Sequence, residues 1–352
     1  MRAFDMTRKV VTGVAITAAF LSITAPTTYT QVAPGGNADR APQTVAAFEQ
    51  LQKELSNWGR WGAADEIGTL NLITDAKRKA AARLVKTGKA ISLAHTLITE
   101  SAPDLPNKPG MSLGPFEMTN GGTTFKYSFH STTHSHVDAL CQFDYEGRLY
   151  NGVKVSEAKG PAGCSKQGME LVKVGFTTRG VLLDIPRLKG VPYLEPGTPV
   201  YPEDIEAWEK MAHVKVQPGD AIFLRTGRWD RRTKVGPWDL IPAKPIDAAG
   251  EAGYHISTMR WMKQRDVAII AADVSNDVRP SGVPQEVLSR VRAMPVHSLA
   301  IVTLGAYIID AVDLEELAAT AAKLNRWEFM VTGAPAAAKG ATGSLVNLTA
   351  IF

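Results

Sequence analysis

The segment FHSTTHSHVDALCQF, residues 129–143, contains three of the seven histidines of the chain. His130, His134, His136 and Asp138 all stand at even positions, and alternate residues of a β-strand face the same side of a sheet. As a strand, the segment would therefore present imidazoles and a carboxylate on one surface. The apolar residues VDALCQF begin within the same segment, and they indicate that the strand runs into the core.

This pattern of side chains predicts a divalent metal site. Imidazole nitrogen and carboxylate oxygen together are typical ligands of zinc and manganese. We therefore expect Zn²⁺ or Mn²⁺, with His130, His134, His136 and Asp138 as candidate ligands. The alternative is a solvated edge strand rich in Ser and Thr, and the apolar residues that follow favour the metal site.

Candidate site residues also occur far from this segment. His297 stands at the start of an apolar helix, and Asp310 closes the strand-like run after it; both are candidate ligands. His255 opens a helix that leads into the apolar strand 267–275, in which Asp273 lies near the end. Acidic residues in such places often belong to a functional site, although many only cap the next turn, so both interpretations of Asp273 stay open.

The composition is that of an ordinary globular protein. Of the 352 residues, 45% are hydrophobic and 21% are charged, with a net charge of +4. The positive charge is scattered, so the basic face that nucleic-acid binding requires is not expected. Helical and strand-like segments alternate without an internal repeat. They predict a single α/β domain over residues 44–352, with a mostly β core and flanking helices.

The spacing of apolar residues predicts the individual elements. Helices are expected over 44–59, 74–88, 202–214, 254–266 and 313–324, and strands over 180–186, 220–227 and 267–275. Residues 295–310 are expected to begin as a helix, break near Gly305 and continue as a strand. Two closing strands are expected in EFMVTGAP and SLVNLTAIF.

The first 33 residues have the order of a secretory signal peptide. A basic start precedes the apolar residues 10–26, and a polar, turn-rich stretch follows them. Residues 34–43 then form a linker. The apolar run is shorter than the about 20 residues that a spanning helix needs, and an uncleaved signal that anchors the chain is the alternative. We expect a periplasmic or secreted protein with no stable membrane span after processing.

The chain has two cysteines, Cys141 and Cys164. Two are too few for a disulfide framework, although an oxidising compartment would permit one bridge between them. Because Cys141 lies within the histidine segment, we favour an isolated thiol that packs beside the site.

Several blocks of the sequence resemble the cyclase family of metal-dependent hydrolases, which includes bacterial kynurenine formamidases and isatin hydrolases. SHVDAL resembles the His-x-Asp half of the family motif HxGTHxDxPxH. The resemblance continues, in the right order, through NWGRWGAADEIGTLNLIT (57–74), RGVLLDIPR (179–187), DVSNDVRPSGV (273–283) and PVHSLAIVTLGAYIIDAVDLEEL (295–317). It covers nearly all of the chain after the leader.

This resemblance implies a swivelling β/β/α-type domain that assembles as a homodimer or homotetramer. It also implies a divalent metal that activates water against a small cyclic amide, a formamide or a lactone. By the motif, His136 and Asp138 are metal ligands, and His297 is a further ligand or a histidine close to the site. Asp310 stands where shorter members of the family have a glutamate ligand.

The resemblance also contains departures from the motif. The first histidine of the motif falls at Thr132, but longer members place it two residues earlier, which is His130 here, and His134 is an extra candidate. The final histidine, which resembles the general acid/base of the formamidases, is Gln142. Glutamine cannot accept a proton at neutral pH, so we expect Gln142 only to orient water.

The working hypothesis is a hydrolase in which metal-activated water attacks a carbonyl carbon. Without a histidine at position 142, proton transfer to the leaving group would fall to His255 or Asp273. One alternative is an exported, catalytically inactive binding protein of the same fold, which the glutamine favours. Another is a metal-dependent lyase or dehydratase.

Overall fold

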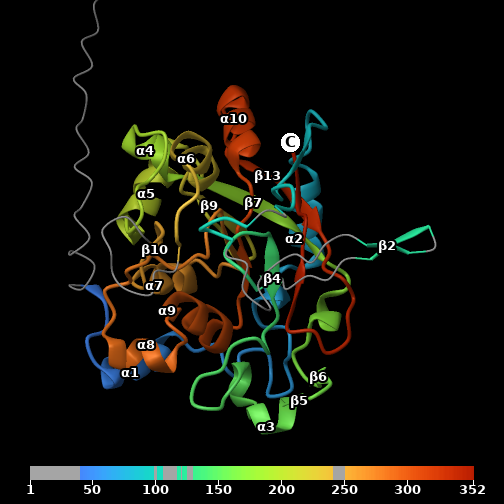
Figure 1. Cartoon of the computed structure of the whole chain (residues 1–352), viewed down its shortest axis with the longest axis vertical. Helices are drawn as coiled ribbons and strands as arrows, with labels where there is room; N and C mark the ends of the chain where they lie inside the picture. The colour runs from blue at the N-terminus through green and yellow to red at the C-terminus, as the bar shows by residue number, and fades with distance from the viewer. Residues whose placement is uncertain (1–39, 99–100, 106–116, 120, 125–129, 241–249) are drawn as a thin grey trace, which may run out of the picture. The chain divides into compact units, whose positions relative to one another are not determined.

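Nine strands form the central sheet of the computed structural model (Figure 1). The structure describes residues 40–98, 101–105, 117–119, 121–124, 130–240 and 250–352. In their order across the sheet, the strands are β1 (Ala90–Ser92), β15 (Thr349–Ile351), β13 (Glu328–Gly333), β7 (Phe176–Asp184), β9 (Ala221–Arg225), β11 (Ile269–Ala272), β12 (Tyr307–Asp310), β4 (His136–Asp138) and β14 (Gly343–Leu345). The four middle strands, β7, β9, β11 and β12, are parallel, and the pairs on both sides of them are antiparallel.

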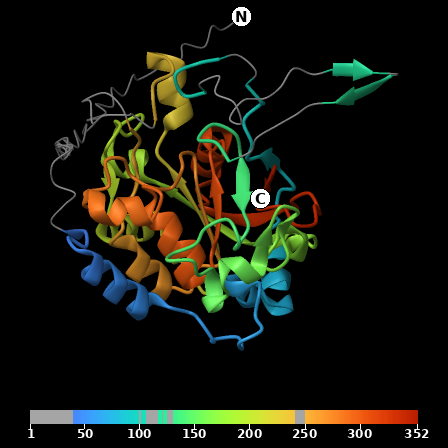
Figure 2. The ribbon, with the colours of Figure 1, turned by 60° about the horizontal axis from the view of Figure 1, so that its bottom comes forward.

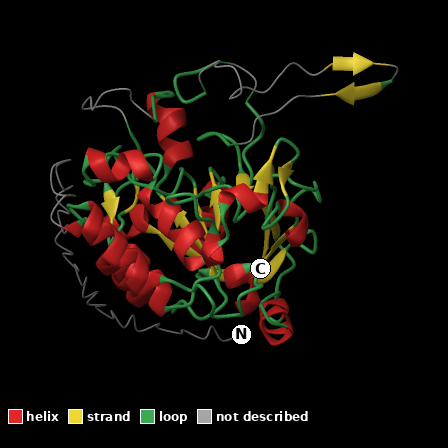
Figure 3. Cartoon of the chain, turned by 90° about the horizontal axis from the view of Figure 1, so that it is seen from below, coloured by secondary structure: helices red, strands yellow, loops and turns green. Residues whose placement is uncertain are grey.

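Helices surround the strands (Figure 3). The α-helices are α1 (Val45–Leu55), α2 (Asp75–Ala82), α3 (Val155–Ala158), α4 (Ile185–Lys189), α5 (Pro202–Met211), α6 (Arg228–Val235), α7 (Thr258–Gln264), α8 (Gln285–Arg290), α9 (Pro295–His297) and α10 (Glu315–Leu324). A π-helix, η5 (Ser298–Leu304), continues α9, and short 3₁₀ helices are η2 (Gly68–Leu72), η3 (Tyr150–Gly152) and η4 (Met169–Val172). The remaining described strands form three two-stranded sheets: β2 (Glu117–Thr119) with β3 (Gly122–Thr124), β5 (Lys159–Gly160) with β6 (Gly163–Cys164), and β8 (Pro199–Val200) with β10 (Gly253–Tyr254).

The parallel strands lie in the core because both of their faces are covered. Every residue of β11 and β12 is buried, as expected of parallel strands between helical layers. Helix α2 packs against β7 and β13, while α1 packs against α7, α8 and η5. Figure 2 shows α1 in blue beside the orange helices of that second group. The predicted α/β fold with flanking helices is confirmed.

Several predicted boundaries follow from local chemistry. Thr44 caps α1 by accepting a hydrogen bond from Ala47, and Thr74 caps α2 in the same way from Lys77. The predicted break at Gly305 is present, since Gly305 ends η5 in the left-handed conformation at φ 67° before β12 begins. A side chain at that position would collide with the ring of Tyr150, so the turn requires glycine for two reasons.

The histidine segment is not one continuous strand, and this part of the prediction was wrong. Only His136–Asp138 is a strand, and residues 130–135 form a turn. The hydroxyl of Ser131 accepts hydrogen bonds from the backbone of Thr133 and His134 at 3.4 and 3.5 Å. Such local bonds from serine compete with the strand ladder. Residue 129, the first of the segment, lies outside the described residues.

The described part of the chain begins before the predicted domain boundary. Ala41 is buried in the core, and Arg40 forms an ion pair with Glu203 at 2.8 Å, so the last residues of the predicted linker contact the domain. The predicted signal peptide, residues 1–33, lies outside the described residues. Among the described helices, none combines the length and the hydropathy that a membrane crossing requires.

Candidate metal centre

The short strand β4 carries the centre of the site between two antiparallel neighbours. His136 and Asp138 lie on one face of β4 because they are two positions apart. Asp310 of β12 pairs directly with His136, and residues directly opposite each other on paired strands share a face. Strand pairing therefore brings a second carboxylate, from a distant part of the chain, beside the imidazole of His136.

Five side chains form a row in which imidazoles and carboxylates alternate. Asp138 Oδ1 lies 2.9 Å from His130 Nδ1 and 3.7 Å from His136 Nε2. Asp310 Oδ2 lies 3.6 Å from His136 Nε2 and 3.1 Å from His297 Nε2. The structure thus brings together five of the residues that the sequence indicated, from the turn before β4, β4, α9 and β12.

The arrangement of His130, His136 and Asp138 fits a divalent cation. Their donor atoms all lie within 4.8 Å of one another, and donors bonded at about 2.1 Å to a tetrahedral zinc ion would be about 3.4 Å apart. Asp138 Oδ1 is buried, and its 2.9 Å contact with His130 Nδ1 is an ion pair only if that ring is protonated. A buried charge is costly unless it is paired, and a cation held with the two imidazoles would pair it.

Hydrogen bonds on the far side of two rings fix their orientation. Nδ1 of His136 lies 2.9 Å from the carbonyl oxygen of His134, so it donates there and leaves the lone pair of Nε2 toward the carboxylates. Nε2 of His130 lies 2.8 Å from the hydroxyl of Thr342, and its Nδ1 faces Asp138. Metal-binding histidines are commonly oriented by partners of this kind.

His297 is held between two carboxylates. Its Nδ1 lies 2.6 Å from Asp277 Oδ2, and its Nε2 lies 3.1 Å from Asp310 Oδ2. Burial opposes the charged ring, but Asp310 and Asp277 outweigh it and raise the pKa of His297 to about 10. Burial likewise opposes the charge of Asp310, yet His297 and His136 hold the pKa of that carboxyl below its ordinary value, and Asn276 donates to its other oxygen at 2.6 Å.

A small cavity of about 110 Å³ opens beside these residues. Its wall contains the five side chains of the row together with Ser131, Thr132, Gln142, Phe143, Ser275, Arg279 and Met294. The wall therefore combines the candidate ligands with one guanidinium and two apolar side chains. Gln142 is at the cavity, as the orienting function predicted for it requires.

His134 lies outside the row of five side chains, whereas His130 belongs to it. Its Nε2 lies 3.1 Å from the backbone nitrogen of Ile98 and 3.2 Å from the carbonyl oxygen of the same residue. Burial is the main reason that the pKa of His134 is lowered to about 4. Of the two candidates for the third ligand, only His130 is placed with Asp138 and His136.

His255 and Asp273 are also away from the cavity, and the geometry does not support their predicted part in proton transfer. His255 is buried against the ring of Tyr201, and its Nδ1 lies 2.8 Å from the hydroxyl of Ser257. Asp273 accepts hydrogen bonds from the backbone of Thr226 and of Gly227 at 2.9 Å. The alternative interpretation of Asp273, a carboxylate that holds the turn after a strand, is the one that the structure shows.

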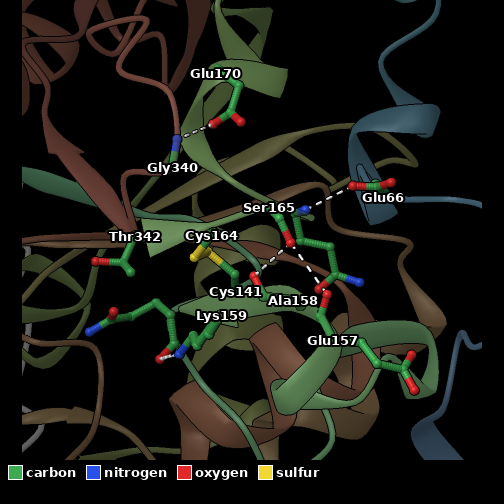
Figure 4. The surroundings of a disulfide bond; sticks show 12 residues. Glu66, Cys141, Glu157, Ala158, Lys159, Cys164, Ser165, Glu170, Gly340 and Thr342 are labelled. Carbon is green, nitrogen blue, oxygen red and sulfur yellow. Dashed lines mark hydrogen bonds between the residues drawn. A yellow bond between two sulfur atoms is a disulfide. The ribbon is translucent and has the colours of Figure 1, made fainter. Parts of the chain in front are cut away.

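The two cysteines form a disulfide bond (Figure 4), so the favoured isolated thiol was wrong and the permitted bridge is present. The bond connects Cys141, next to the cavity residue Gln142, with β6. Cys164 donates from its backbone to the carbonyl oxygen of Gly340 at 2.8 Å. Gly340 stands two residues before Thr342, the partner of His130, so the bridge fixes two sides of the site to each other.

Asp277 and Asn276 are site residues that the sequence did not identify by function. Both follow β11, as Asp273 does, and spacing alone does not separate Asp277 from Asp273. The position of each aspartate relative to the end of β11 is the signal that separates them. The carboxylate of Asp273 turns back to the backbone at 226–228. The carboxylate of Asp277 reaches α9 and accepts a hydrogen bond from the backbone of Val296 at 2.7 Å.

Comparisons with known proteins agree with this architecture. A family model described as "Putative cyclase" matches residues 71–277. A crystal structure described as a novel cyclase is similar over 84% of this chain and 99% of its own, with 30% sequence identity and a TM-score of 0.71. Isatin hydrolase A from Labrenzia aggregata, bound to benzyl benzoate, is similar over 74% of this chain and 93% of its own, with 17% identity and a TM-score of 0.52. This last likeness is one of fold. Among curated proteins, none matches the chain.

Proposed function

The chain belongs to the cyclase family, and from that premise we propose that it is a metal-dependent hydrolase that opens a small cyclic amide or lactone, or cleaves a formamide. The observation that carries the proposal is that the donor atoms of His130, His136 and the buried Asp138 all lie within 4.8 Å of one another, with Asp138 Oδ1 2.9 Å from His130 Nδ1. The residues that would hold a Zn²⁺ or Mn²⁺ ion are His130, His136 and Asp138, with Asp310 on the neighbouring strand. When bound, such an ion lowers the pKa of water and polarises a carbonyl group.

The protein residues around that ion would have separate functions. His136 and His130 are oriented by the carbonyl oxygen of residue 134 and by Thr342, so their ring nitrogens need not reorient when the ion binds. Gln142 lines the cavity as a neutral hydrogen-bonding group and can orient water without exchanging a proton.

Proton transfer to the leaving nitrogen or oxygen is assigned to His297. It is the histidine of the cavity wall whose pKa is raised, to about 10, despite the opposing effect of burial, because Asp310 and Asp277 stabilise the charged ring. Asp277 holds Nδ1 at 2.6 Å, and the proton that can be donated is therefore the one on Nε2. A group that protonates the leaving atom contributes about 10²–10⁴-fold to rates of this kind.

The experiment is to measure metal content and hydrolysis together. Purified protein is analysed for zinc and manganese, and a panel of cyclic amides, lactones and formamides is tested before and after chelation. His136→Ala should lose both the metal and the activity. His213→Ala is the matched control, because His213 is exposed and is not one of the residues that line the cavity. Full hydrolysis by metal-free protein would contradict the proposal.

Bound metal without turnover on any compound would instead favour a binding protein of this fold. Gln142 is the observation in favour of that second candidate, since it lines the cavity where an acid/base group would be useful. The substitution Gln142→His tests it. If the wild type is inactive and the variant hydrolyses a compound, the wild type lacks only the acid/base group. If the variant is also inactive, the result supports binding as the function.

Export to the periplasm or the exterior, and assembly into a homodimer or homotetramer, are further parts of the proposal. The disulfide bond between Cys141 and Cys164 supports export, because such bonds persist in oxidising compartments and are rare in the cytosol. Fractionation of cells that express the full chain tests the location, and light scattering of the purified protein tests the assembly.

A further inference from the structure

Arg279 is a partly buried cation in the wall of the cavity that the row of imidazoles and carboxylates does not use. It lies in the loop after β11, and its side chain is only 13% exposed. Its Nε and Nη1 atoms are buried, and neither makes a hydrogen bond to the described residues. Buried guanidinium groups normally have their N–H donors satisfied. Here Nη1 has only the ion pair with Glu251 and Nε has no hydrogen bond to the described residues, so a ligand could supply a further acceptor.

The neighbouring Glu251 balances the charge of Arg279 but does not saturate it. Glu251 Oε1 lies 3.3 Å from Arg279 Nη1. The same carboxylate already accepts from the backbone nitrogen of Ser275, at 3.0 Å, and from the hydroxyl of that residue. Burial raises the pKa of Glu251, against the opposing effect of Arg279. One carboxylate that serves several donors leaves the guanidinium with unmet hydrogen-bonding capacity.

The position of Arg279 is fixed by its backbone. Its N–H donates to the carbonyl oxygen of Glu251 at 2.9 Å, and the N–H of Glu251 donates back at 3.3 Å. The side chain therefore starts from a rigid point at the edge of the cavity. Preorganised donors bind an anion at a lower cost than donors that must first be ordered.

Arg228 is a second buried arginine of this protein, and both of its Nη atoms have acceptors within the protein, although its Nε also lacks a hydrogen bond to the described residues. Its guanidinium is also buried, and it donates to the carbonyl oxygen of Thr132 and to Asp104. These acceptors belong to the protein, so Arg228 holds the turn before β4 in place. Arg279 has no equivalent acceptors among the described residues apart from the ion pair with Glu251.

We propose that Arg279 binds a carboxylate carried by the substrate, separate from the carbonyl group that is hydrolysed. The planar fork of a guanidinium matches a carboxylate with two parallel hydrogen bonds. Phe143 and Met294 line the same cavity, and they provide apolar surface for the part of the substrate between its two polar ends. The substrate class is then a cyclic amide, lactone or formamide that carries a carboxylate. The assignment of the reaction rests on the proposed function, whereas the binding of the carboxylate does not.

The test compares benzoate with benzamide, which has a similar shape and no charge. Binding to the full-length protein is measured by titration calorimetry after the metal has been removed, so that no ion can bind the carboxylate. Benzoate should bind about tenfold or more tightly than benzamide, as expected of a charge-assisted bidentate contact. Arg279→Met should remove this difference, and Arg279→Lys should keep only part of it. Equal binding of the two probes by the wild type, or a preference that survives in Arg279→Met, would overturn the proposal.

Two further variants separate this result from misfolding. Arg260→Met is the matched control: Arg260 forms an exposed ion pair with Glu54, and its loss should leave the preference for benzoate unchanged. Glu251→Gln removes the competing carboxylate, and benzoate should bind more tightly, which a damaged protein would not do. Weaker binding by Glu251→Gln at unchanged thermal stability would count against the proposal.

A last comparison identifies the source of the carboxylate. With the metal restored, phthalate should bind more tightly than benzoate, because one carboxylate can approach the metal while Arg279 takes the other. Equal affinities would indicate that Arg279 only meets the carboxylate formed by hydrolysis, and would overturn the assignment to the substrate. Metal analysis of the same samples keeps the two proposals apart: protein without metal affinity refutes the proposed hydrolase, while the metal-free comparison of benzoate with benzamide still decides the function of Arg279.

Discussion

Removal of the disulfide bond should lower the stability of the protein by an amount that can be worked out from its place in the chain. The double substitution Cys141→Ala/Cys164→Ala opens a loop whose ends are 23 residues apart. In the chain-entropy description, a cross-link over a loop of this length stabilises the fold by about 3.4 kcal/mol at 25 °C. For the roughly 310 residues from Arg40 onward, with an unfolding entropy of about 2.1 cal/mol/K per residue, this loss corresponds to a fall in Tm of about 5 °C.

The assay is differential scanning calorimetry of the wild type, the double variant and wild type reduced with dithiothreitol. Thiol titration in denaturant should find no reactive thiol in the unreduced wild type and two after reduction. Reduction removes the bond and leaves both side chains in place, so it controls for the small cavities that alanine creates at these buried positions. A fully reduced wild type that melts within about 1 °C of the oxidised protein would refute the reasoning, because the cross-link would then contribute far less than loop closure requires.

Four other outcomes test particular contacts. Asp277→Asn weakens the contact that orients His297, so metal affinity or activity should fall about 10–100-fold; unchanged values of both would show that the carboxylate is dispensable. Asp273→Ala removes the acceptor of several backbone N–H groups, so urea unfolding should show a loss of about 2–4 kcal/mol with an unchanged metal content; loss of metal at unchanged stability would restore Asp273 to the site. Arg228→Met leaves Asp104 with one fewer buried partner, and denaturant titration should show a loss of about 3–5 kcal/mol; a neutral effect would mean that the pair is not coupled to folding. Chelation should lower the Tm of the wild type, because an ion present at 1,000 times its Kd stabilises the fold by about 4 kcal/mol; a Tm that does not respond to chelation or to added zinc and manganese would argue against a bound ion.

Much of the fold could be predicted because its signals are local. Helices α1 and α2 begin at threonine caps, and η5 ends at a glycine that no other residue could replace without a collision. The apolar runs of β9 and β11 indicated buried strands, and both are buried. The order of the strands across the sheet is not a local property, since β4 lies between strands that come much later in the chain.

The candidate site could be predicted in composition but not in detail. Period-two spacing grouped His136 with Asp138, whose positions on β4 agree with it. The same argument failed for His134, because the backbone bends at 131–134 before the strand begins, where the Ser131 hydroxyl accepts long hydrogen bonds from Thr133 and His134. Asp273 had every local mark of a site residue, yet its carboxylate faces the backbone of a neighbouring strand end. Such distinctions depend on side-chain direction, which spacing does not determine.

Charge partners and cross-links were the least accessible features. Arg279 is one arginine among many in the sequence, and the lack of hydrogen bonds from its Nε and Nη1 to the described residues can be recognised only when its surroundings are known. The bond between Cys141 and Cys164 could be stated as permitted, but the choice between a bridge and a free thiol required the distance between the two residues. In both cases the deciding information lies in segments that are distant along the chain.

The pairing of β4 with β12 has a consequence for how the protein is made. His136 and Asp138 are synthesised early, but their neighbour across the sheet, Asp310, follows 174 residues after His136. Thr342, which holds His130, comes later still. A ribosome must therefore release most of the polypeptide before Asp310 and Thr342 can join the three ligands near β4, so an emerging chain should bind a cation less tightly than the folded protein. Metal acquisition would then be a late step of maturation, and the metal supply of the compartment in which folding ends, rather than that at the ribosome, would decide which ion the finished protein carries.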